Sequence, residues 1–238
     1  KVERVVFVQE EVRQEALRLW GWPEEKTVVV PNFVLEDEYR APVEDARSGL
    51  VLGMVGIVPQ RKRFDRALDL LEKLRADGHA ARLMIKGPRP ETLDFMRAPG
   101  RAAELQYYRD LYRRIEESLL LAGHVSFEGW GNDVALWYRQ VDHILSPSDF
   151  ESFHYALADG VLSGCQPVVW PWKGAGSLYR DDWVVEDLDA AAGRIVEWAA
   201  LDPEERRARR RDNRETVVSK YGSKTIFSRL DDILGVQP

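Results

Sequence analysis

Short, mostly apolar runs alternate with amphipathic stretches along most of the chain. The apolar runs suit strands buried in a parallel sheet, and they lie at 50–55, 81–85, 124–127, 141–145 and 167–170. Between them, apolar residues recur every three or four positions, which predicts helices at 64–76, 102–121 and 190–200. This alternation predicts an α/β fold with a Rossmann-like parallel sheet and helices on both faces.

The two ends of the chain lie outside this alternation. Residues 1–35 predict a strand, a helix and a second strand, and residues 36–48 are acidic without an apolar period, which predicts an interdomain linker. We therefore divide the chain into an amino-terminal piece (1–35), the linker (36–48), a ligand-binding domain (49–202) and carboxyl-terminal helices (203–238).

Composition narrows the functional classes. The net charge of -6 offers no basic field for nucleic acid. The single cysteine, Cys165, cannot form an internal disulfide, which favours a cytoplasmic location. No apolar run reaches the length of a membrane span. The arginine-rich helix expected over 203–220 carries interleaved acids, which indicates a solvated helix, and a weak contact with the inner membrane surface stays open.

The stretch 144–170 carries the most chemistry. It reads as a strand, a loop, a helix from about His154 and a second strand. Ligands bind at the carboxyl ends of strands in such sheets, and a helix amino terminus suits a phosphate. Glu151 and Asp159 frame this site, and carboxylates accept hydrogen bonds from hydroxyl groups. Hydroxyls beside a diphosphate indicate a nucleotide-sugar, although a buried βαβ unit with incidental acids would look similar.

The run Glu-Ser-Phe-His-Tyr-Ala-Leu-Ala-Asp-Gly, followed by Ser-Gly-Cys-Gln-Pro-Val-Val, resembles the E-x7-E region of retaining GT-B glycosyltransferases of the family 4 type. The usual form there is E-G-F-G-x-x-x-x-E-A, then G-x-P-V-V. Asp159 is one methylene shorter than the usual Glu, and Ser152 and His154 stand where glycines are usual.

The resemblance implies a role for each matched position. Glu151 would hold hydroxyls of the donor sugar, and Asp159 would hold the ribose hydroxyls. The leaving diphosphate would meet the start of the helix, where the expected donor-binding residues are Ser152, Phe153, His154, Tyr155 and the N–H of Ala156. The His154 side chain would bond a phosphate or a sugar hydroxyl, and a capping or packing role explains it as well.

A basic loop follows the strand at 50–55, beginning with Gly56 and ending with Arg61, Lys62 and Arg63. It resembles the family's G-R-x-x-x-x-K-G loop, whose Arg and Lys hold the diphosphate. Lys62 matches the Lys, whereas Ile57 replaces the Arg. Cations at a helix start are repelled by the positive end of the helix dipole. A bound anion would relieve this repulsion, whereas it would persist if the three cations were only solvated. We expect Lys62 to contact phosphate and Arg61 or Arg63 to supply the missing charge.

Other features carry weaker signals. Trp130 lies in a loop that resembles the family's base-contacting loop, and stacking on a base or packing explains it equally well. Gly174 matches one glycine of the family's G-G-x-x-E turn, which meets donor-sugar oxygens. Asp133 is expected to cap the helix that follows it. The Asp-x-Asp run at 187–189 is interpreted as a helix start and not as a metal site.

The resemblance implies a retaining, metal-independent glycosyltransferase without a cofactor. It would transfer a sugar from a nucleotide diphosphate sugar to a glycan or other acceptor, with Lys62 and Glu151 at the reacting centre. Residues 1–35 would be the tail of an acceptor-binding domain that is otherwise absent.

Three rival functions stay open. The first is a nucleotide-sugar-binding module without transferase activity of its own. A dehydrogenase is disfavoured because the first basic loop lacks G-x-G-x-x-G. A sugar-nucleotide epimerase would need an acid–base set for which no motif is visible.

Overall fold

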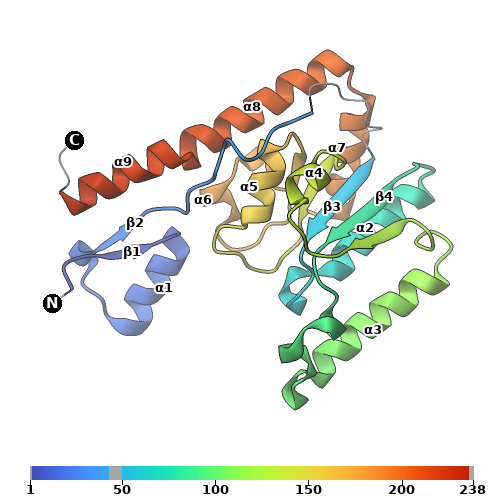
Figure 1. Ribbon diagram of the computed structural model, residues 1–238, viewed down its shortest axis with the longest axis horizontal. Coiled ribbons are helices and arrows are strands. Elements are labelled where there is room, and N and C mark those ends of the chain that lie inside the picture. Colours follow the sequence, from blue (N-terminus) through green and yellow to red (C-terminus); the bar gives the residue numbers. More distant parts are fainter. Residues whose placement is uncertain (1, 43–49, 236–238) are drawn as a thin grey trace.

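The computed structural model describes residues 2–42 and 50–235, which contain two parallel sheets (Figure 1). The small sheet pairs β1 (Val5–Phe7) with β2 (Thr27–Val29). The large sheet has the order β5-β4-β3-β6-β7. Its strands are β3 (Val51–Val55), β4 (Arg82–Lys86), β5 (Val125–Glu128), β6 (His143–Ser146) and β7 (Gln166–Val169). The predicted α/β fold class is confirmed.

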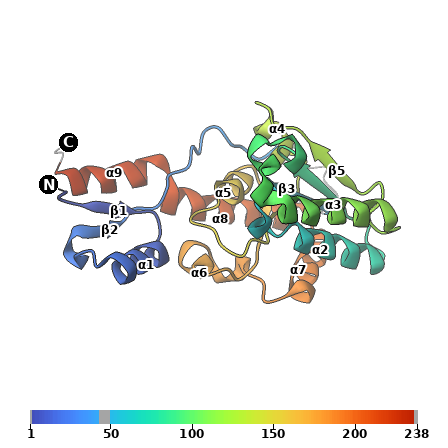
Figure 2. The ribbon, with the colours of Figure 1, turned by 90° about the horizontal axis from the view of Figure 1, so that it is seen from below.

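The helices connect these strands and cover both faces of the large sheet (Figures 1 and 2). Their bounds are α1 (Glu10–Trp20), α2 (Phe64–Ala76), α3 (Ala102–Glu117), α4 (Val134–Tyr138), α5 (Tyr155–Leu162), α6 (Ala175–Leu178), α7 (Leu188–Ala200), α8 (Pro203–Tyr221) and α9 (Ser223–Leu234).

Side chains of the central strands alternate between two apolar clusters. On β3, Leu52 and Met54 pack with α2, α3 and α7, whereas Val51 packs with α4, α5 and α8. Each strand is therefore buried on both faces, which explains why the sequence shows continuous apolar runs instead of an apolar–polar alternation.

The strand order reverses between β3 and β6. From β3 the chain goes outward to β4 and β5, then returns to place β6 on the other side of β3. The connections on the two sides of this junction leave a crevice at the carboxyl ends of the strands, which is where open α/β sheets bind ligands.

The carboxyl-terminal helices return to the amino-terminal unit. In both views α8 runs along the large unit, and α9 lies against β1 and β2 on the side opposite α1 (Figures 1 and 2). Phe227 of α9 contacts Phe33, and Arg229 donates to the Val29 carbonyl at 3.0 Å. The small sheet is thus covered by a helix on each face.

The structure differs from the sequence prediction at three places. The helix expected over 102–121 ends at Glu117, and 119–124 form turns. The apolar run Trp183–Val185 suits an edge strand, but the structure reduces it to one bridge between Val169 and Val184. Residues 36–42 of the expected linker are held by Arg214 of α8 and by Ser223 at the start of α9, while 43–48 lie outside the described residues.

Candidate functional site

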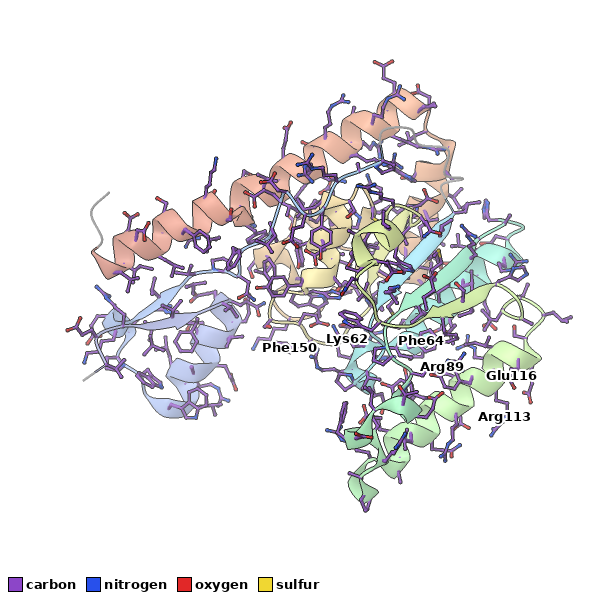
Figure 3. All side chains as sticks on the ribbon, in the orientation of Figure 1. Lys62, Phe64, Arg89, Arg113, Glu116 and Phe150 are labelled. Carbon is purple, nitrogen blue, oxygen red and sulfur yellow. The ribbon has the colours of Figure 1, made fainter. Side chains whose placement is uncertain are left out.

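A cleft of about 490 Å³ opens at the carboxyl ends of β3 and β6. It combines the loop after β3, the loop and helix after β6, and the segment after β2. Its lining is Asn32, Tyr39, Val55, Lys62, Trp130, Val134, Tyr138, Glu151, Ser152, Phe153, His154, Tyr155, Ala156 and Asp159. Lys62 lies in the middle of the molecule, on the side of the large sheet that faces the small unit (Figure 3).

Lys62 and Glu151 form an ion pair in this cleft. The Lys62 Nζ lies 2.5 Å from Glu151 Oε1, and Ser148 Oγ donates to the same oxygen at 2.8 Å. Burial raises the pKa of the Glu151 carboxyl, but the charge of Lys62, with the hydrogen bonds from Lys62 and Ser148, outweighs burial and lowers it. Glu151 is therefore ionised at neutral pH.

His154 begins α5 with a left-handed backbone, at φ 61° and ψ 69°. Glycine adopts this conformation freely, whereas other residues are strained in it. The family's usual glycine at this position therefore has a physical reason, and His154 occupies the position in spite of the strain.

The His154 ring is held by Ser146. Its Nδ1 lies 2.7 Å from Ser146 Oγ, and that oxygen also accepts from Trp172 Nε1 at 3.3 Å. Because the indole can only donate, the Ser146 hydroxyl is able to donate to Nδ1, and in that arrangement Nε2 carries the ring proton. Burial, with the charge of Lys62, lowers the pKa of His154 to about 3, so the ring is a neutral donor at the cleft wall.

Asp159 lies one turn into α5 and forms a hydrogen bond with the Tyr39 hydroxyl. Burial raises the pKa of the Asp159 carboxyl to about 7; the bond from Tyr39 opposes this rise and the Glu38 carboxylate adds to it. Asp159 is thus divided between its protonated and ionised forms near neutral pH.

The two arginines beside Lys62 are placed differently. Arg61 is not part of the cleft lining, but its Nη1 lies 3.4 Å from Oε2 of Glu151, which lines the cleft, and donates to the Phe150 carbonyl at 2.5 Å. Arg63 does not line the cleft, because its guanidinium pairs with Asp65 at 2.7 Å and with Asp149 at 2.9 Å. Of the two, only Arg61 is in a position to add charge beside Lys62.

Gly56 and Gly174 also lie outside the cleft lining. Gly56 packs against Gly87, and a Cβ added to Gly87 would lie 3.8 Å from the Trp130 ring. The two glycines therefore let the loops after β3 and β4 come close together beneath Trp130. Gly174 instead faces the small unit, because its added Cβ would meet Gln9 and Glu11. Trp130 lines the cleft with 68% of its surface exposed, which leaves its face open for stacking.

The expectation that Asp133 caps α4 is wrong. Its side chain makes no capping bond, and both carboxylate oxygens accept from Lys86 Nζ at 2.9 Å. Lys86 is 2% exposed at the end of β4, and a buried ammonium requires a carboxylate partner more strongly than a helix end does. The helix start expected at the Asp-x-Asp run is confirmed, since Asp187 caps α7 by accepting from the Ala190 N–H.

Sequence reasoning missed several residues of the cleft. Tyr39, Asn32 and Tyr138 line it, and Ser146 and Ser148 hold its polar side chains. The two serines were visible in the Ser-Pro-Ser run after the strand, whereas Tyr39 lies in a stretch without an apolar period, and its position depends on α8.

The described residues contain no group of three or more His, Cys, Asp or Glu that is arranged to hold a metal ion. Across the same residues, no helix is both long and apolar enough to cross a membrane.

Several solved structures share this fold. The Anabaena protein HepE, in complex with UDP and glucose, superposes with a TM-score of 0.79 at 17% identity, over 99% of this chain and 64% of its own. TarM of S. aureus gives 0.75 at 16% identity, over 97% and 43%. Sucrose-phosphate synthase of Thermosynechococcus elongatus gives 0.74 at 17% identity, over 98% and 59%. The chain therefore spans less than two thirds of each of these proteins.

No curated protein matches the sequence. The sequence model described as "Glycosyl transferases group 1" matches residues 49–200, which hold the whole large sheet and every charged residue of the cleft. Because this match covers more than half of the chain, the protein belongs to the glycosyl transferases group 1 family, and its fold is that of the carboxyl-terminal part of GT-B glycosyltransferases.

Proposed function

We propose that this chain is the donor-binding part of a retaining glycosyltransferase that transfers a sugar from a nucleoside diphosphate sugar to a glycan or other acceptor. The observation that carries this is the arrangement of charge in one cleft. Lys62, paired with Glu151, lines this cleft together with the amino terminus of α5, and the second carboxylate, Asp159, lies one turn further along that helix.

The reaction chiefly requires stabilisation of the departing diphosphate. Lys62 has three donor hydrogens, so it can keep Glu151 and still bond a phosphate oxygen. The first-turn N–H groups of α5, from Tyr155 and Ala156, have no carbonyl within the helix to bond and add the positive dipole end. Preorganised donors of this kind act where negative charge develops, so this transfer would proceed without a metal ion.

The two acids indicate where the donor sugar and the ribose would bind. Glu151, ionised and fixed by Lys62 and Ser148, would accept hydrogen bonds from donor-sugar hydroxyls. Asp159 would accept from the ribose, and Trp130 would stack on the base. Neutral His154 would donate from Nε2 to an oxygen between the two acids. The relatives support this assignment, because HepE was solved with UDP-glucose.

The test is the thermal stability of this chain with UDP, GDP, ADP, dTDP and NAD, each with and without EDTA. A ligand at 100 times its dissociation constant adds about 2.7 kcal/mol to the unfolding free energy. Stabilisation by a nucleoside diphosphate that EDTA does not change would support the proposal. Stabilisation by NAD alone, or by none of the five, would contradict it.

A second candidate is a donor-binding module without transferase activity of its own. This candidate rests on the cleft lining, because the roles proposed for Lys62, Glu151 and Asp159 hold a donor and do not by themselves require transfer. Hydrolysis or transfer of the bound donor's sugar by this chain would exclude this candidate, whereas nucleotide binding without turnover would support it.

A further inference from the structure

The segment at 33–40 is a fixed wall of the cleft. Arg214 of α8 donates from Nη1 to the Tyr39 carbonyl at 2.7 Å and from Nη2 to the Glu36 carbonyl at 2.6 Å. The same Nη1 donates to the Leu162 carbonyl at 2.7 Å, at the end of the helix that carries Asp159. One guanidinium therefore fixes the backbone of Tyr39 relative to α5.

The Tyr39 side chain points from this wall to Asp159. Its hydroxyl bonds the Asp159 carboxyl, and its ring lies edge-on to Tyr138 with the centroids 5.9 Å apart. Tyr39, Tyr155 and Asp159 line both the donor cleft and an adjoining cavity of about 290 Å³. The Tyr39–Asp159 pair thus stands at the boundary of the two spaces, where one end of a bound nucleotide would reach.

The hydrogen-bonding capacity of this pair is specific. When the phenol donates its single proton to the carboxylate, the phenol oxygen and the second carboxylate oxygen both remain as acceptors. A vicinal diol presents two donors and matches two neighbouring acceptors. Asp159 is one methylene shorter than the glutamate usual at this position, and the Tyr39 hydroxyl extends its polar surface into the cleft.

We propose that Tyr39 and Asp159 bind the ribose 2′,3′-diol as a pair, which makes Tyr39 a specificity-determining residue that selects ribonucleoside over 2′-deoxyribonucleoside diphosphate sugars. This inference rests on the proposed donor-binding function. It adds Tyr39 to the donor site, a residue that lies outside the large sheet and outside the Glu151–Asp159 run.

The test is calorimetric titration with whichever of UDP, GDP and ADP binds most tightly, and with its 2′-deoxy and 3′-deoxy forms. Each ribose hydroxyl would donate to a site acceptor, so the wild type should bind at least one deoxy form about tenfold more weakly, a difference of about 1.4 kcal/mol. In Tyr39→Phe that ratio should fall to about twofold. Tyr112→Phe, which removes a buried hydroxyl that lines neither space, should keep the wild-type ratio.

Affinity for pyrophosphate, which has no ribose, reports whether Tyr39→Phe is correctly folded and should stay unchanged. Equal ribo-to-deoxy ratios in wild type and Tyr39→Phe would overturn this inference and leave the donor site standing. A wild type that binds no nucleoside diphosphate would overturn the donor site itself, and this inference with it.

Discussion

The Lys62 ammonium lies 2.5 Å from the Glu151 carboxylate, although the two residues follow different strands, β3 and β6. These strands are neighbours at the point where the strand order reverses. Their pairing therefore fixes a cation at the crevice before any ligand enters. The ion pair also keeps Glu151 charged in a site that buries it, so both the positive and the negative group are ready for a donor.

Replacing Lys62 by alanine should separate phosphate binding from folding. A hydrogen bond to a charged group contributes about 1.5–3 kcal/mol, so affinity for a nucleoside diphosphate should fall about 10- to 100-fold. Affinity for the nucleoside, which lacks phosphate, should not change. Calorimetric titration of both ligands makes the comparison.

The same variant removes the nearer of the two cations beside the buried Glu151 carboxylate and leaves only Arg61, at 3.4 Å, which should lower the unfolding free energy by about 1–3 kcal/mol. The double variant Lys62→Ala/Glu151→Gln should recover much of this stability without recovering phosphate affinity. Unchanged diphosphate affinity in Lys62→Ala would disprove the phosphate role of Lys62.

His154 can be tested with two substitutions that differ only in backbone freedom. His154→Gly and His154→Ala both remove the ring that bonds Ser146, but only glycine relieves the left-handed conformation at φ 61°. Urea denaturation should therefore find the glycine variant about 1 kcal/mol more stable than the alanine variant. Both should lose donor affinity by a similar factor, about two- to tenfold for one neutral hydrogen bond.

The pH dependence of the wild type is a second check on His154. Burial lowers the pKa of His154 to about 3, so no step in donor affinity is expected at pH 6–7 from this ring. The unfolded chain still takes up a proton there, because an exposed histidine has a pKa of about 6.5. Stability should thus fall as the pH drops below about 6.5, and it should fall less in His154→Gly. Equal slopes in the two proteins would mean that His154 is protonated in the fold.

The large sheet and its ligand edge could be predicted from the sequence because both depend on local pattern. Apolar runs mark doubly buried strands, and the loops at 56–63 and 147–154 follow them directly. Lys62, Glu151 and Asp159 therefore fall in one cleft as expected.

Contacts between segments far apart in sequence could not be predicted in this way. Asp133 meets Lys86 across 47 positions, and Tyr39 is fixed by Arg214 across 175 positions. Gly174, expected at the donor sugar, faces Gln9 of the small unit. Each of these outcomes depends on how α8, β4 or α1 packs, and no local spacing encodes that packing.

Asp159 should make both stability and binding depend on pH near neutrality. Burial raises the pKa of its carboxyl to about 7, while Tyr39 opposes and Glu38 favours the rise. In the unfolded chain the pKa is about 3.9, so the folded state holds the proton more tightly. The stabilisation of the fold by the proton on Asp159 is fully present below about pH 4 and is lost as the pH rises through 7.

Asp159→Asn keeps the neutral form at every pH and so isolates this effect. It should match the wild type in stability at about pH 4 and exceed it at pH 8 by about 2–4 kcal/mol. The affinity of the wild type for the donor should rise with pH, because the ionised Asp159 carboxylate accepts hydrogen bonds from the ribose. Wild-type affinity should therefore increase between pH 6 and 8, whereas the affinity of Asp159→Asn should not change. A wild-type affinity that does not change over this range would refute the role of the carboxylate.

Two glycines in helices should respond to alanine in opposite directions. Gly160 of α5 packs directly on β6, where an added Cβ would lie 2.9 Å from Ile144 side-chain atoms, and the α5–β6 contact that positions Asp159 would have to widen. Gly193 of α7 is exposed, and an added Cβ would meet no atom within 4 Å.

Gly193→Ala should therefore stabilise the fold by about 0.5–1 kcal/mol through helix propensity. Gly160→Ala should destabilise it by about 1–3 kcal/mol through overpacking. Urea denaturation measures both stability changes. Because a shift at Gly160 would move α5, and with it Asp159, only Gly160→Ala should also weaken nucleotide binding. A stabilised Gly160→Ala would show that α5 does not pack on Ile144 as closely as the structure places it.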